Sequence, residues 1–359
     1  MTKALDIFKI KNAADYTYSP SFTYPGKIGT EIFMKPSEAT PALSDIFNIR
    51  QGIRTDEYLV LATEMGRIVT ANPGCTPTYT ASNTLSDRKI SVKKLGVYGE
   101  WCKDDWTAVA NQLAEDPSWV ADGNSGYELT AKLQRFLIEA RLDAVRRDLF
   151  ALAFFANDTV ATSNFYYGNG MEGLFAKMYD AFSSYCVKRV GNSLPNQFNS
   201  VLTTDQAYNA FKATHVGANN RLKALANREK MFLVTQSVYE NLLESYESKS
   251  NGATEVQFKL LTDGTTGLTY RGIDVVPVPY FDTLLEDSTN PWYNNLRHFI
   301  IYMPKTSSRF SNLVLGTENA SDLNKLDVFY VPEERKMKMQ MDFRLGVQFI
   351  HCDLIAFHD

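Results

Sequence analysis

Residues 336–349 read KMKMQMDFRLGVQF, and this stretch carries the strongest structural signal in the chain. From Met337 to Phe349 every second residue is apolar, and the residues between them are polar, charged or glycine. Successive side chains of a strand point to opposite faces, so seven such repeats predict long β-strands with one buried face. Gly346 falls in the polar series and is interpreted as a bulge or a bend.

Upstream of this stretch, helix and strand signals alternate. Residues 231–234 predict a buried strand, and Ser237 to Glu240 match a capping box that opens a helix. Residues 273–276 and 298–301 predict two more strands. Pro277 and Pro279 place the first of these near the edge of a sheet or at the end of the strand.

The clearest helix is predicted at 125–157. Ser125 to Glu128 match another capping box, and apolar residues then recur at helical spacing as far as Ala156. Asp143 and Arg147 are spaced to form an i,i+4 ion pair. At about 1.5 Å per residue this helix is roughly 45 Å long, enough to cross a whole domain. A shorter helix is expected at 104–121.

The N-terminal third lacks a compact core of its own. Four prolines make residues 1–50 irregular, either a flexible tail or an arm that lies over neighbouring subunits. Residues 53–102 predict two long β arms joined by a turn-rich polar stretch, and such an excursion needs a partner surface. Four aromatic residues favour the arm interpretation: Tyr16, Tyr18, Phe22 and Tyr24.

Composition excludes several classes of protein. The net charge of −4 lacks the basic excess of a dedicated nucleic-acid-binding protein. No secretory signal and no apolar run long enough to span a membrane is visible. The four cysteines show no CxxC pair, so free thiols in a reducing cytoplasm are expected.

Motifs for chemistry are weak. Residues 168–173 match GxGxxG, but neither a buried strand before them nor an acid about twenty residues later completes a dinucleotide site. They are interpreted as a turn before a helix. In a strand, His351 and Cys352 would point to opposite faces, which disfavours a metal site. No catalytic residue, cofactor site or metal site is therefore assigned, and the protein is not expected to be an enzyme.

Basic residues are interpreted as surface or contact residues. The stretch 221–230 is expected to be mainly a solvated helical face. The β excursion carries four cations that, with the aromatics of 1–50, are the candidate inter-subunit contacts: Arg88, Lys89, Lys93 and Lys94.

The order of these parts, an arm, a β excursion, a long helix, a mixed region and returning strands, resembles the Hong Kong 97-type capsid fold of tailed phages. Several stretches carry the resemblance: 85–106, 170–174, 231–246, 270–277 and 344–349. The resemblance covers nearly the whole chain and implies an α+β fold. It implies an N-terminal arm at 1–50, an extended loop at 51–103, and a peripheral domain at 104–169 with the spine helix 125–157. The axial domain would be 170–330, and 331–359 would return to the peripheral domain.

By this resemblance the chain is a major capsid protein that assembles in the host cytoplasm into hexamers and pentamers of an icosahedral virion head. Its partners would be copies of itself, portal and scaffolding proteins, and packaged double-stranded DNA in non-specific proximity. Some relatives begin with a scaffolding segment that is later cleaved, and this chain shows none, so either scaffolding is a separate protein or the chain is a trimmed form. The initial Met favours a separate scaffolding protein. Two alternatives stay open, an encapsulin-like bacterial compartment shell and, more remotely, an NAD-dependent oxidoreductase.

Overall fold

A computed structural model of the chain divides into two compact units, each built from separate stretches of sequence. The first unit contains Met1–Glu38, Lys94–Ala151 and Asn319–Phe343, and the second contains Ala39–Lys93, Leu152–Glu318 and Arg344–Asp359. The structure describes residues 42–62, 85–102, 131–158, 165–166, 170–184, 186–196, 200–248, 256–260, 266–293, 296–308, 311–323, 327–331, 333–334 and 336–359. The expected helix at 104–121 and the capping box at 125–128 lie outside these residues.

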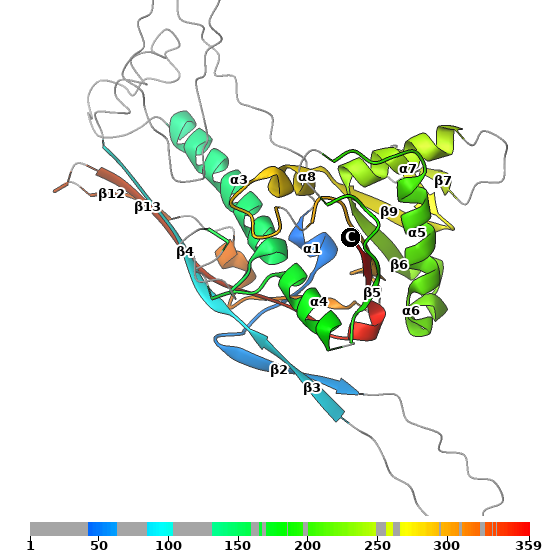
Figure 1. Cartoon of the computed structure of the whole chain (residues 1–359). Helices are drawn as coiled ribbons and strands as arrows, with labels where there is room; N and C mark the ends of the chain where they lie inside the picture. Colours follow the sequence, from blue (N-terminus) through cyan, green and yellow to red (C-terminus); the bar gives the residue numbers. More distant parts are fainter. Residues whose placement is uncertain are drawn as a thin grey trace, which may run out of the picture. The chain divides into compact units, whose positions relative to one another are not determined.

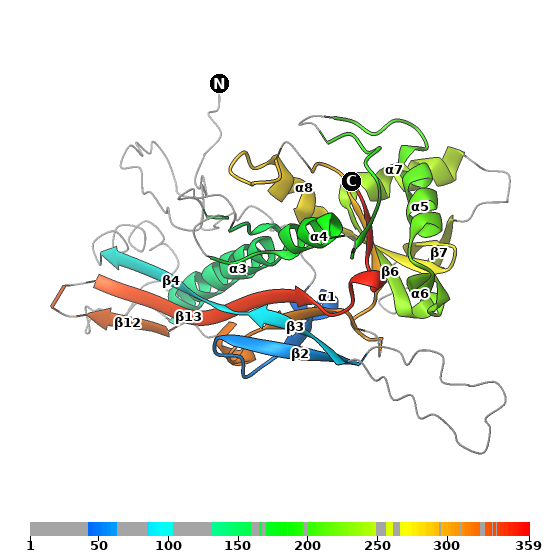
Figure 2. The same ribbon diagram turned by 60° about the horizontal axis from the view of Figure 1, so that its bottom comes forward.

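The first unit holds most of the long helix α3 (Ala131–Phe155), together with β4 (Lys93–Cys102), β12 (Asp327–Val331) and the first part of β13 (Lys336–Phe349). Strand β12 runs antiparallel to β13, with Asp327 opposite Gln340, and β4 also pairs with β13. Figure 2 shows β12 beside the start of β13. The predicted long helix is confirmed from residue 131, but Asp143 pairs with Arg146 and not with Arg147.

The alternation predicted for the C-terminal strand is confirmed. Along β13, Met339, Met341 and Leu345 are each at most 2% exposed, whereas Gln340 and Asp342 are exposed. Apolar burial drives this orientation, since one face is removed from water and the other stays solvated.

A seven-stranded sheet forms the centre of the second unit. Its order is β5-β14-β10-β6-β9-β8-β7. The inner strands β6 (Lys230–Thr235) and β10 (Ile300–Pro304) are antiparallel and buried throughout, as expected from their continuous apolar sequences. The other strands are β5 (Lys188–Gly191), β7 (Val256–Leu260), β8 (Thr266–Tyr270), β9 (Ile273–Val278) and β14 (Ala356–His358), of which β5 and β7 lie at the two edges.

Strand β9 lies inside this sheet, parallel to β6. The prediction that its prolines mark the edge of a sheet is therefore wrong, and the alternative, that they mark the end of the strand, is confirmed. Strand β8 pairs with β9 only at Asp274 and Ile273, so Pro277 faces no ladder partner on that side. Pro279 then begins α8 (Pro279–Glu286), a position where the missing amide proton costs nothing.

Helices α5 (Gln206–Gly217) and α7 (Gln236–Ser248) pack beside each other along this sheet (Figure 1). The predicted capping box at Ser237 is wrong, because α7 already begins at Gln236. The carboxylate of Asp282, on α8, accepts a hydrogen bond from the backbone amide of Gln236 at 2.7 Å. A cap supplied by a residue 46 positions later cannot be seen in a local pattern.

Helix α4 (Leu174–Ser183) follows the GxGxxG stretch, as predicted. Gly170 has a φ of 60°, and a Cβ on Gly173 would meet the backbone carbonyl of Phe154. Phe175 of α4 packs into an aromatic cluster of the second unit, whose other members are Phe154, Phe155, Phe281 and Phe299.

The second unit also contains a short parallel pair, which corrects the view that residues 1–50 are wholly irregular. Helix α1 (Leu43–Ile46) leads into β1 (Asn48–Arg50), which pairs with β11 (Leu313–Gly316). Strand β11 in turn pairs with residues 346–349 of β13. The pairing of β1 with β11 joins segments more than 260 residues apart, which explains why no local sequence signal predicted it.

Gly346 is not a bulge. It pairs in regular register with Gly316, and a Cβ at Gly346 would lie 2.2 Å from the carbonyl oxygen of Ser91. Glycine is required here because the backbone at Ser91 and Val92 crosses close to β13.

Candidate functional site: the β2–β3 ribbon and the Cys186–Cys352 disulfide

The predicted β excursion is confirmed only in part: an antiparallel ribbon forms in the second unit, but residues 93–102 of the expected second arm form β4, which pairs with β13. Strands β2 (Asp56–Ala62) and β3 (Leu85–Ser91) pair from Asp56 opposite Ser91 to Ala62 opposite Leu85. Figure 2 shows the two strands side by side. The polar stretch expected between them lies outside the described residues.

One face of the ribbon is anchored in its own unit. Leu59 and Ile90 are buried together with Ile53, Val92 and Val314 in a small apolar cluster. The base of the ribbon therefore has its partner surface within the same chain. An isolated two-stranded ribbon is marginal in water, so this cluster is what fixes its orientation.

The opposite face is exposed and partly apolar. Tyr58 is 58% exposed and Val60 is 70% exposed, and both lie on β2. Among the described strands, β2 pairs only with β3, which leaves the outer edge of β2 without a backbone partner there. An exposed edge with apolar side chains is a surface that favours association with another chain.

Two of the predicted contact residues, Arg88 and Lys89, lie on the ribbon and point to opposite faces. Lys89 lies on the outer face, where its ammonium contacts the Asp56 carboxylate at 2.7 Å and lowers the pKa of Asp56. Lys93 and Lys94 are also exposed, and within the first unit Lys94 lies 3.7 Å from Asp342. Pairs this exposed contribute little to folding, so these cations remain available to a partner. The aromatic candidates Tyr16, Tyr18, Phe22 and Tyr24 lie outside the described residues.

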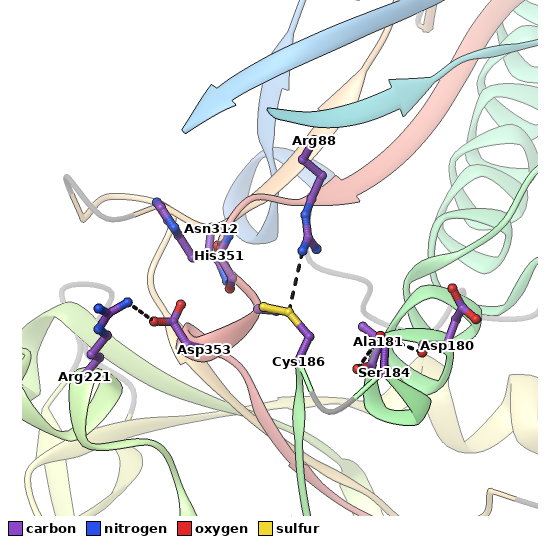
Figure 3. The surroundings of a disulfide bond; sticks show 10 residues. Arg88, Asp180, Ala181, Ser184, Cys186, Arg221, Asn312, His351 and Asp353 are labelled. Atoms are coloured by element: carbon purple, nitrogen blue, oxygen red, sulfur yellow. Dashed lines mark hydrogen bonds and ion pairs between the residues drawn. A yellow bond between two sulfur atoms is a disulfide. The ribbon is translucent and has the colours of Figure 1, made fainter. Parts of the chain in front are cut away.

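Arg88 differs from the other three cations, because it is half-buried on the inner face. Its guanidinium lies 4.6 Å from the centre of the Phe349 ring and donates a hydrogen bond to Cys186 Sγ at 3.7 Å. Figure 3 shows the side chain directed at the sulfur. Burial lowers the pKa of Arg88, while the Asp353 carboxylate opposes that shift. An arginine nonetheless stays protonated at neutral pH.

Cys186 and Cys352 form a disulfide, which corrects the expectation of free thiols for this pair. Cys186 lies between α4 and β5, and Cys352 begins the 3-10 turn η4 (Cys352–Leu354), so Cys352 is not in a strand as assumed. The two cysteines are 166 positions apart, and no spacing rule relates cysteines at that separation. The parallel pairing of β5 with β14, which begins a few residues after each cysteine, brings the two together, and no sequence signal indicates that pairing.

Buried polar groups in the second unit are used for structure. The Nδ1 atom of His298 lies 2.8 Å from Ser237 Oγ and its Nε2 atom lies 3.3 Å from the Ser200 carbonyl, so both ring nitrogens are occupied. Burial lowers the pKa of His298 to about 4, which keeps the ring neutral.

Lys230 is only 1% exposed, which corrects the expectation of a solvated face at this residue.

Within the described part of the chain, no cluster of three or more His, Cys, Asp or Glu side chains could hold a metal ion. No described helix is both long and apolar enough to cross a membrane.

No protein-family model and no curated protein sequence matches the chain. Solved structures do match. The capsid of Myoviridae phage XM1 aligns with a TM-score of 0.55 and 12% identity, covering 93% of this chain and 96% of that one. The chain has the fold of a phage capsid protein.

Two further matches agree with this capsid fold. The cyanophage A-1(L) capsid gives a TM-score of 0.51 at 14% identity, covering 93% of this chain and 96% of that one. The capsid of a native GTA particle gives 0.51 at 12% identity, covering 94% of both chains. The resemblance predicted from the order of segments is thus confirmed at the level of fold, and neither the compartment shell nor the oxidoreductase is supported.

Proposed function

We propose that the protein is a major capsid protein that assembles into hexamers and pentamers of an icosahedral phage head and resides in the virion. The proposal rests on the extent of the structural alignments, which include nearly the whole of this chain and of the matched capsid chains. The protein is a structural component and not an enzyme. Its principal partner is a second copy of itself. Portal and scaffolding proteins and packaged double-stranded DNA follow from the same role, with assembly in the host cytoplasm.

The segments expected from the sequence fit this role as a working division. Residues 1–50 are the arm, 51–103 the extended loop, and 104–169 the peripheral domain with its spine helix. Residues 170–330 are the axial domain, and 331–359 are the returning strands. Strand β14 pairs with β5 and β10, so the last of the returning strands adds to the sheet of residues 170–330.

The outer face of the β2–β3 ribbon is proposed as an inter-subunit surface. Tyr58 and Val60 supply apolar area, and Lys89 supplies charge on the same face. Lys93, Lys94 and the aromatics Tyr16, Tyr18, Phe22 and Tyr24 are kept as further candidates. Arg88 acts from the inner face, where it contacts the disulfide.

The test is assembly of purified protein, alone or with its scaffolding partner, followed by electron microscopy. We expect capsomers or closed shells. A protein that stays monomeric at high concentration under all these conditions would contradict the proposal.

A substitution tests the ribbon surface separately. Val60→Asp places a charge on the exposed apolar face and should block assembly while leaving circular dichroism and melting unchanged. Val60→Thr, which keeps the shape of the side chain, is the matched control and should assemble. Normal shells from Val60→Asp would show that this face meets no neighbour.

A further inference from the structure

The Cys186–Cys352 pair and its surroundings form a chemically defined cluster apart from the ribbon's outer face. The Cα atoms are 5.4 Å apart, which lies within the range that permits a disulfide without backbone movement. Both cysteines are intermediate in exposure, so neither is sealed in the core. A pair that is both bridgeable and reachable can exchange with thiols in solution.

A cavity of about 240 Å³ opens over Cys186. Its walls come from β3, α4 with the segments on either side of it, and the end of β13. They carry two cations and two carboxylates: Arg88, Lys177, Glu172 and Asp180. Lys177 lies 3.3 Å from Glu172. Mixed charges around an open cavity suit a small zwitterionic molecule better than an apolar one.

Arg88 distinguishes the two sulfurs. Its guanidinium lies 3.7 Å from Cys186 Sγ, and this hydrogen bond would become an ion pair if Cys186 were a thiolate. Next to Cys352, in contrast, Asp353 carries a negative charge, which Arg221 partly balances at 2.7 Å. Figure 3 shows Arg88 and the Asp353–Arg221 pair at opposite ends of the disulfide. A neighbouring cation favours the thiolate, which is the nucleophilic form, so Cys186 is the better nucleophile.

The Cys352 side is held in place. The backbone amide of His351 donates to Asn312 Oδ1 at 2.6 Å, and Asn312 Nδ2 donates to the His351 carbonyl at 2.7 Å. These two bonds fix the turn that presents Cys352, so its sulfur stays close to Cys186 after reduction.

We propose that Cys186 and Cys352 are a redox-active pair that exchanges with low-molecular-weight thiols and disulfides, such as glutathione, through the Arg88 cavity. Cys186 is the attacking cysteine and Cys352 the resolving cysteine. The oxidised pair covalently joins the start of β5 to the turn before β14.

The exchange balances in two steps. The Cys186 thiolate attacks one sulfur of oxidised glutathione, forming a mixed disulfide and releasing one glutathione thiolate. The Cys352 thiolate then attacks Cys186 Sγ, forming the protein disulfide and releasing the second. Two protein thiols are thereby oxidised and one glutathione disulfide is reduced to two glutathiones. Reduction of the protein follows the same steps in reverse.

The mixed disulfide can be trapped. Full-length Cys352→Ser protein, reduced and then exposed to oxidised glutathione, should retain one glutathione on Cys186, found by peptide mass spectrometry after alkylation of the remaining thiols. Cys186→Ser protein should carry far less on Cys352. Equal modification of Cys352 would overturn the assignment of Cys186. A wild-type pair whose oxidation state ignores the ratio of reduced to oxidised glutathione would overturn the proposal.

Arg88 is tested by the alkylation rate of Cys186 in reduced protein at neutral pH. Arg88→Gln should slow it roughly threefold to tenfold, and Arg88→Lys, which keeps the charge, should restore most of the rate. Arg228→Gln is the matched control, because Arg228 is exposed and does not line the cavity. An unchanged rate in Arg88→Gln protein would overturn the role of Arg88. If Arg88→Gln fails to fold, the Arg88→Lys and glutathione-trapping experiments still decide the proposal.

Discussion

At the scale of single residues, Gly346 shows how little room the second unit leaves where two backbones cross. Gly346→Ala should destabilise the protein by about 1–3 kcal/mol, because the added methyl group meets backbone and not a mobile side chain. Urea unfolding midpoints measure the loss. Gly99→Ala is the control, since a Cβ there would meet only the flexible end of Met339, at 3.0 Å. Equal midpoints for the two variants would contradict the close crossing at Ser91.

Because the pKa of the buried His298 is lowered, we expect the free energy of unfolding to depend on pH. Its folded pKa of about 4 lies below the ordinary histidine value, so the unfolded chain binds a proton that the folded protein excludes. The contribution of the neutral His298 to folding stability is complete above about pH 6.5 and is lost as the pH falls toward 4. Between pH 7 and pH 5 the loss is about 2 kcal/mol. In the His298→Gln variant, the free energy of unfolding measured by urea titration should fall less between pH 7 and pH 5 than it does in the wild type. A slope identical to that of the wild type would exclude His298 as its source.

The sequence alone could single out a residue such as Gly346, but it could not identify the distant residue that it contacts. Gly346 stood out within the alternating strand, yet the reason, the passing backbone of Ser91, comes from a segment 255 positions earlier. The same holds for Cys186, Cys352 and Asp282, whose partners are distant in the chain. Lys89, Lys93 and Lys94 are exposed, as expected for charged side chains, which are seldom buried.

At the scale of elements, β13 offers the sharpest test of burial. Met341→Asp should cost several kcal/mol, because Met341 is 2% exposed and the new carboxylate would be buried. Gln340→Glu, one residue away on the exposed face, should change stability by at most about 0.5 kcal/mol. Soluble yield and the melting temperature measure both effects. Comparable behaviour of the two variants would contradict the assignment of the buried face.

Elements with strong periodicity could be predicted from sequence, and elements created by pairing could not. Strand β13 and helix α3 carry their own patterns, since β13 alternates apolar and polar residues and α3 repeats apolar residues at helical spacing. Strands β1 and β14 have three residues each, too few for a pattern, and they exist because β11, β10 and β5 supply hydrogen-bond partners. Sequence order nevertheless identified the fold, because the succession of long elements is itself distinctive.

At the scale of the whole molecule, the disulfide should contribute to stability by restricting the unfolded chain. The closed loop spans 166 positions, and such cross-links typically contribute about 2–4 kcal/mol. A variant with both Cys186→Ser and Cys352→Ser should melt several degrees below the oxidised wild type. Reduced wild-type protein serves as the control and should melt close to the variant. A variant as stable as the oxidised protein would show that the cross-link adds nothing.

The position of β14 in the seven-stranded sheet has a consequence for synthesis. Strand β14 lies between β5 and β10, although β5 is made about 165 residues earlier. While the ribosome is still translating the intervening sequence, β5 has no neighbour on that side and β10 presents an unpaired edge. Completion of this sheet must therefore wait until residues 356–358 have left the exit tunnel. A nascent chain stalled before that point carries two open strand edges that can pair with other nascent chains on the same polysome.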